Sequence, residues 1–131
     1  MQKLVNRLAF IFLIVSSYAD SLPPNHAGRM KAGTDLFKKT IRPTLIENCL
    51  KCHGDEKVRS GLDISTRELL LEGGETEAAI NLEKPEKSYL LSLIRHEEEP
   101  EMPPKKAKLP DSIVADFQKW IALGAPYDKP L

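Results

Sequence analysis

The residues best suited to chemistry lie together in the segment Cys49-Leu50-Lys51-Cys52-His53. Cys49 and Cys52 are the only two cysteines of the chain, they are three positions apart, and His53 follows directly. This is the pattern of covalent c-type haem attachment, in which each thiol forms a thioether with one vinyl group of the haem. The imidazole that follows is then placed to bind the iron. The segment therefore predicts one covalently attached haem c, with His53 as proximal iron ligand.

A Cys-x-x-Cys pair also occurs in disulfides, in redox-active dithiols and in zinc sites. A zinc site usually needs four ligands, and His26 and His96 lack the spacing of a familiar zinc motif. A redox dithiol is expected beside a thioredoxin-like βαβ pattern, which the sequence does not contain. A haem-free disulfide or zinc module therefore stays open as an alternative to the haem interpretation.

A second iron ligand is predicted at Met102, which two prolines follow. Proline disfavours helical geometry in the preceding residue, so this loop should present the Met102 thioether from an extended, stiff backbone. Without haem, a methionine would more often fill a gap in the core. His96 is the main competitor for the distal position, because imidazole also binds haem iron. Arg59, close to the cysteine motif, is a candidate contact for the haem propionates.

The N-terminus is typical of an export signal. Lys3 and Arg7 precede an apolar run over residues 8–15, and small residues stand at Ser17 and Ala19. We expect a signal peptide, residues 1–19, and a periplasmic mature protein. The apolar run is shorter than the roughly 20 residues of a membrane-spanning helix, so no stable membrane insertion is expected after cleavage.

Composition limits the partners of the predicted mature chain, residues 20–131. Removing residues 1–19 takes away two basic residues and no acidic one from totals of 19 each, which leaves a formal charge of 17 − 19 = −2. This balance argues against nucleic acid as a partner. Aromatic residues make up only 6% of the chain, so a large apolar cofactor would supply core material that the sequence lacks.

The expected elements are helical. Residues 20–33 contain prolines and glycines and are expected to form a flexible leader. A first helix should begin at Thr34 or Asp35, kink or restart at Pro43, and run into Cys49. Later helices are expected after the capping-box pattern of residues 65–68, from Pro85, and from Asp111 or Ser112. The apolar faces of the first and last helices are predicted at Phe37, Ile41 and Leu45 and at Ile113, Phe117, Trp120 and Gly124.

Several short motifs extend the pattern along about 90 residues. They are Phe37-x3-Ile41-Arg42-Pro43-x-Leu45, Cys49-x2-Cys52-His53, Gly61-Leu62-Asp63, Arg67-x2-Leu70-x2-Gly73-Gly74, Pro85-Glu86-Lys87-Ser88-Tyr89-Leu90, Met102-Pro103-Pro104, Lys108-Leu109 and Trp120-Ile121-x2-Gly124-Ala125-Pro126. From about residue 36 to residue 127 the chain thereby resembles the planctomycete-type cytochrome c domain, a class I-like c-type cytochrome. It departs from the family pattern over residues 74–84.

The resemblance implies an all-α, small class I cytochrome c-like fold over residues 34–128. Its N- and C-terminal helices would cross, and covalent haem would lie in the core. It also implies that Cys49 and Cys52 attach the haem, and that His53 and Met102 bind the iron. The implied function is electron transfer with unidentified redox partner proteins, and no enzymatic activity is expected. A haem sensor or weak peroxidase, in which a small ligand displaces Met102, is the alternative within the haem interpretation.

Overall fold

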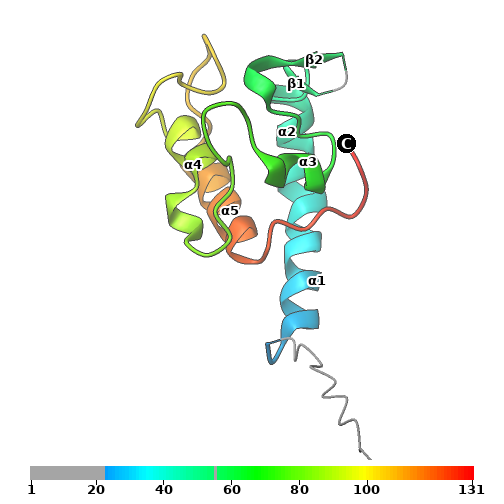
Figure 1. Ribbon diagram of the computed structural model, residues 1–131. Coiled ribbons are helices and arrows are strands. Elements are labelled where there is room, and N and C mark those ends of the chain that lie inside the picture. The colour runs from blue at the N-terminus through cyan, green and yellow to red at the C-terminus, as the bar shows by residue number, and fades with distance from the viewer. Residues whose placement is uncertain (1–22, 55) are drawn as a thin grey trace, which may run out of the picture.

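The computed structural model describes residues 23–54 and 56–131 (Figure 1). The predicted signal peptide, residues 1–19, lies outside these residues. The described part is helix-rich, and its only sheet pairs two-residue strands, β1 (His53–Gly54) and β2 (Lys57–Val58), antiparallel. This agrees with the predicted all-α class. None of the described helices is both long and apolar enough to cross a membrane.

The N-terminal helical column is built from three consecutive elements (Figure 1). These are α1 (His26–Leu36), the π-helical segment η1 (Phe37–Ile41) and α2 (Arg42–Asn48). The junction residues keep right-handed helical angles, with φ −58° and ψ −52° at Phe37 and φ −53° and ψ −55° at Arg42. Pro43 has no N–H to donate and would crowd the preceding turn of a regular α-helix, and the wider π-turn before it accommodates that conflict. The helix therefore continues past Pro43 to the cysteine motif.

The prediction that residues 20–33 form a flexible leader is wrong for His26–Gly33, which are helical. The prediction that the first helix begins at Thr34 or Asp35 is wrong for the same reason. The apolar pattern of α1 is weak, so the reason lies in contacts with distant residues. Arg29 donates a hydrogen bond to the carbonyl oxygen of Ala122 at 2.7 Å. Gly33 is buried so closely that an added Cβ would lie 2.6 Å from the Pro126 side chain. Tertiary packing thus extends the helix where local pattern did not predict it.

The C-terminal helix, α5 (Asp111–Ala122), packs against η1 through aromatic rings. The ring centroids of Phe37 and Trp120 are 5.8 Å apart, and Phe117 meets Trp120 edge-on at 6.1 Å. The buried residues of α5 are Val114, Phe117, Trp120 and Ile121. The predicted face is thus confirmed at its two aromatic positions, whereas Ile113 is only half-buried.

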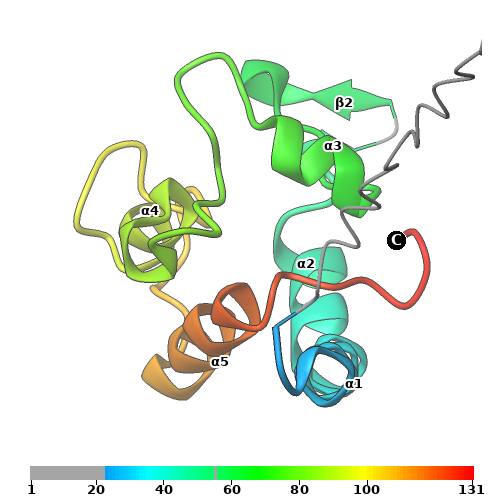
Figure 2. The same ribbon diagram turned by 60° about the horizontal axis from the view of Figure 1, so that its bottom comes forward.

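Shorter elements complete the fold: η2 (Arg59–Gly61), α3 (Arg67–Glu72), η3 (Pro85–Lys87) and α4 (Tyr89–Ile94). The cap of α3 is Thr66, whose side chain accepts a hydrogen bond from the Leu69 N–H at 3.2 Å. Gly73, with φ +77°, ends that helix in a conformation that few other residues adopt. Figure 2 shows α4 and α5 to the left of α2, and α3 with strand β2 above it.

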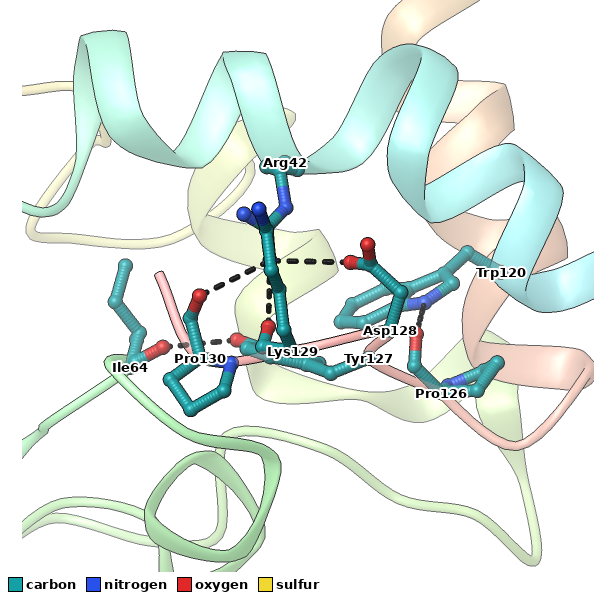
Figure 3. A network of polar contacts seen from close by, with 8 residues as sticks. All are labelled: Arg42, Ile64, Trp120, Pro126, Tyr127, Asp128, Lys129 and Pro130. Atoms are coloured by element: carbon teal, nitrogen blue, oxygen red, sulfur yellow. Dashed lines mark hydrogen bonds and ion pairs between the residues drawn. The ribbon is translucent and has the colours of Figure 1, made fainter.

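The side chain of Arg42, at the start of α2, binds the C-terminal tail, which is the segment that follows α5, residues 123–131 (Figure 3). Its guanidinium donates to the carbonyl oxygens of Lys129 at 2.6 Å and Pro130 at 3.0 Å, and pairs with the Asp128 carboxylate at 3.0 Å. The same group lies over the Phe37 ring, 5.3 Å from its centroid. One cation thus joins the helical column, the aromatic core and the tail.

The tail in turn holds the loop that follows the strands. The Tyr127 hydroxyl donates to the Ile64 carbonyl oxygen at 2.9 Å (Figure 3), and the Leu131 N–H donates to the Ser65 carbonyl oxygen at 2.8 Å. The Ile64 N–H donates to the carbonyl oxygen of His53 at 2.8 Å. A continuous set of hydrogen bonds therefore links the tail to the cysteine motif.

Replacing Arg42 by Ala should lower the free energy of unfolding by about 2 kcal/mol, because three acceptors of the tail lose a charged donor. Urea unfolding followed by circular dichroism measures the change. Arg29→Ala is the matched control: Arg29 is exposed and donates to one carbonyl, so its loss should cost at most about 1 kcal/mol. Equal losses in the two variants would contradict the role assigned to Arg42.

Candidate functional site

The four predicted site residues come from two separate stretches of the chain and line one cavity of about 340 Å³. Cys49 directly follows α2, Cys52 precedes β1, and His53 is the first residue of β1, whereas Met102 lies in the loop between α4 and α5. A second hollow, of about 460 Å³, lies between α1 and the end of α5 and contains none of the four. The smaller cavity is therefore the candidate site.

Backbone hydrogen bonds shape the cysteine motif into a compact turn. The Cys49 N–H donates to the Leu45 carbonyl oxygen at 2.9 Å, continuing the pattern of α2. The Cys52 and His53 N–H groups both donate to the Cys49 carbonyl oxygen, at 3.1 and 3.0 Å. The Cys52 carbonyl oxygen accepts from the Arg59 N–H at 3.0 Å. Because the helix end and the strand start are tied together in this way, both thiols and the imidazole reach the same cavity.

The sulfur groups of the motif are chemically available. Cys49 and Cys52 are free thiols, and both are half-buried. Burial raises the pKa of the Cys49 thiol to about 11, an effect that the positive charge of Lys106 opposes and that Cys52 reinforces. Cys49 is therefore a protonated thiol at neutral pH.

The imidazole of His53 carries a buried ring nitrogen without a partner. Its Nδ1 has no hydrogen-bond partner among the residues that the structure describes. A buried polar atom without a partner is costly and calls for an explanation, such as a ligand-binding role. Since His53 lines the cavity, its ring is suited to binding a group held there.

The two candidates for the distal position separate in space. Met102 lines the cavity, and His96 is not among the lining residues. The His96 Nε2 lies 3.1 Å from the Met102 carbonyl oxygen, and its Nδ1 lies 3.4 Å from a carboxylate oxygen of Glu101. The His96 ring thus faces the Met102 carbonyl oxygen and Glu101, whereas Met102 itself lines the cavity.

The walls of the cavity are mostly apolar. They come from α2, the segments between β2 and α4, α4 itself, the loop after α4, and α5: Leu45, Leu62, Ile64, Leu70, Ala79, Leu90, Leu93, Ile94, Pro103 and Trp120 all contribute. Leu70 comes from the leucine-rich helix α3, and Ala79 from the segment that departs from the family pattern. Helical periodicity predicts Trp120 only on the apolar face of the last helix. Its position in the wall has no signal in the spacing of the motif, because the contact depends on how α5 docks.

The cavity is large and apolar enough to hold a prosthetic group. Its volume falls in the range of ligand pockets, about 300–1,000 Å³. Two thiols, an imidazole and a thioether at its wall are the donor set that haem c requires.

No conventional metal cluster accompanies this site. Within residues 23–54 and 56–131, no group of three or more His, Cys, Asp or Glu side chains gathers closely enough to hold a metal ion. The zinc alternative had proposed that His26 or His96 join the cysteine motif. Neither residue lines the cavity that contains Cys49, Cys52 and His53.

A helix-rich domain whose apolar cavity gathers a Cys-x-x-Cys-His motif and a methionine has the features of a small c-type cytochrome. Residues 49–106 match the family described as planctomycete cytochrome C, which confirms the resemblance identified from the sequence. The matched region contains Cys49, Cys52, His53 and Met102. No curated protein and no solved structure gives a significant match to the chain.

Shortening a buried side chain of the cavity wall should lower the free energy of unfolding more than shortening an exposed side chain elsewhere. Leu70 is 1% exposed, and Leu70→Ala should lower the free energy of unfolding by about 2–5 kcal/mol through lost contacts and added empty volume. Leu82 is 43% exposed and is absent from this cavity, so Leu82→Ala should change it by less than about 0.5 kcal/mol. Urea unfolding of the exported protein compares the two, and a small effect at Leu70 would argue against its place in the wall.

Proposed function

We propose that the protein is an electron-transferring c-type cytochrome with one haem c attached through Cys49 and Cys52. In this proposal His53 and Met102 are the axial iron ligands. The observation that carries it is the convergence of these four side chains on a single apolar cavity. The family match over residues 49–106 supports the same assignment.

Each residue has a distinct task. The two thiols would form the thioether bonds, and the His53 imidazole and the Met102 thioether would occupy the two axial positions. When bound, haem supplies an iron that accepts and returns one electron. The Met102 thioether favours the ferrous state and therefore a comparatively high reduction potential. If His53 and Met102 both bound the iron, they would leave no position open for a substrate, so we expect electron transfer rather than catalysis.

The cavity wall would control the surroundings of the cofactor. Its apolar residues exclude water, and a dry surrounding shifts the potential of a redox centre. Polar side chains at the wall include Arg59, Ser60 and Thr76. Arg59 is the cation that we propose as a contact for the haem propionates, because a guanidinium pairs well with carboxylates.

We further propose a class I cytochrome c arrangement, in which the column from α1 to α2 and the helix α5 are the crossing terminal helices. The aromatic contact between Phe37 and Trp120 supports this pairing. The domain would then extend from α1 to the tail, beyond the predicted limits 34–128. We propose export to the periplasm by the signal of residues 1–19, with a redox partner protein and without stable membrane insertion.

Covalent attachment can be tested directly. Cys49→Ala combined with Cys52→Ala, produced with export in a haem-attaching host, should give a protein without haem stain on a denaturing gel, because no thiol remains to form a thioether. Lys51→Ala is the control, since Lys51 is exposed between the two cysteines and should leave the stain unchanged. A colourless wild-type product with the mass of the bare polypeptide would refute the proposed function.

The distal ligand can be tested by Met102→Ala. The variant should bind carbon monoxide rapidly in the reduced state, because an axial position opens, and its reduction potential should fall. Rapid kinetics and potentiometry measure these changes. The wild type should bind carbon monoxide slowly, whereas rapid binding would favour a haem sensor or weak peroxidase. An unchanged spectrum and potential in Met102→Ala would remove Met102 from the ligand set.

A further inference from the structure

Both polar groups of the Met102 main chain form hydrogen bonds, one with Leu93 in α4 and one with His96, two residues beyond the end of α4. The Met102 N–H donates to the Leu93 carbonyl oxygen at 3.1 Å. The Met102 carbonyl oxygen accepts from the His96 Nε2 at 3.1 Å. A carbonyl oxygen can only accept, so this ring nitrogen carries the hydrogen. The position of the Met102 backbone therefore depends on two residues that precede it by nine and six positions.

The His96 ring is held in place for this contact. Its Nδ1 faces a carboxylate oxygen of Glu101 at 3.4 Å, and its side chain is only 17% exposed. The backbone of His96 turns away from α4 with φ +59°, in the left-handed region. Its N–H still donates to the Leu93 carbonyl oxygen at 3.2 Å. The side chain is thus directed back across the loop toward Met102.

The rest of this loop gives Met102 little support. Residues 97–101 are all exposed, and four of the five are glutamates. Its described contacts are few. The Glu97 N–H donates to the Ser92 carbonyl oxygen, and the Glu101 N–H donates to the Glu99 side chain at 3.3 Å. The exposed carboxylates of Glu97 and Glu101 lie 4.0 and 3.4 Å from side-chain nitrogens of Arg95 and His96. Such a segment would be mobile without anchors at its ends. The bond from His96 is therefore a principal anchor of the residue that reaches the cavity.

We infer that His96 is a positioning residue that holds the Met102 thioether at the cavity wall through the hydrogen bond from Nε2 to the Met102 carbonyl oxygen. The inference rests on the proposed function, because it takes Met102 as the distal iron ligand. It assigns His96 a role other than ligand, since His96 acts through Met102 and does not line the cavity. Loss of the bond should raise the fraction of molecules in which the thioether has left the iron.

Two substitutions at His96 separate the hydrogen bond from backbone strain. In His96→Gln the side-chain amide nitrogen can reach the position of Nε2 and donate. In His96→Asn the amide is one carbon shorter and cannot reach it, although asparagine adopts the left-handed conformation more readily than glutamine. A role in hydrogen bonding predicts a defect in the Asn variant and rescue in the Gln variant. If His96 matters only for the left-handed backbone conformation, the Gln variant should be defective and the Asn variant should resemble wild type.

The readouts report the iron–thioether bond in holoprotein exported from a haem-attaching host. We expect His96→Asn to bind carbon monoxide in the reduced state roughly threefold to tenfold faster than wild type, the range that corresponds to one lost hydrogen bond. The far-red absorption band of the thioether–ferric haem pair should weaken in parallel. His96→Gln and the control His26→Asn, altered at the distant start of α1, should stay within twofold of wild type.

The outcomes distinguish this inference from the proposed function. Haem stain and protein mass are measured first for every variant. A wild type without covalent haem would refute the proposed function itself. Covalent haem in all variants, with unchanged carbon monoxide binding in His96→Asn or with equal acceleration in His96→Gln, would overturn the positioning role alone. Because the Gln variant must retain the wild-type rate, it tests the inference even if the Asn variant is not obtained as a folded protein.

Discussion

Trp120 connects the parts on which the site depends. Its ring is fully buried, lies 5.8 Å from that of Phe37 in the N-terminal column, and forms part of the cavity wall. Its Nε1 donates to the Pro126 carbonyl oxygen at 2.9 Å, where the tail begins to cross the column. Aromatic burial contributes several kcal/mol and also a defined geometry. One side chain therefore fixes how α5, the column and the tail surround the site.

The tail extends this organisation to the cysteine motif. The Tyr127 ring stacks on Phe37 with centroids 4.2 Å apart, and its hydroxyl bonds the Ile64 carbonyl oxygen. Burial raises the pKa of the Tyr127 hydroxyl, so it stays a hydrogen-bond donor over the physiological range. Ile64 then bonds His53 through the main chain. His53 is thus supported from the C-terminal tail, and Met102 from α4 and the residues that follow it.

Local chemistry explains which features could be predicted. A short helix ended by Gly73 is predicted after the capping-box pattern of residues 65–68, and the structure confirms α3 there, with Thr66 rather than Ser65 as its cap. The aromatic face of α5 follows from helical periodicity. The start of α1 could not be predicted, because its support comes from Ala122 and Pro126, about 90 residues away in the chain. Contacts of that separation leave no periodic signal in the segment itself.

The sequence by itself determined the chemistry that the site can offer: two thiols and an imidazole at fixed spacing, and one thioether before two prolines. Residue type and short spacing set these properties, and they hold in any fold that exposes them to a common partner. Only the tertiary structure decided that Met102 and not His96 lines the cavity, and that Ala79 and Trp120 form its walls. Such choices depend on the docking of helices and loops, which is a balance of packing over the whole chain.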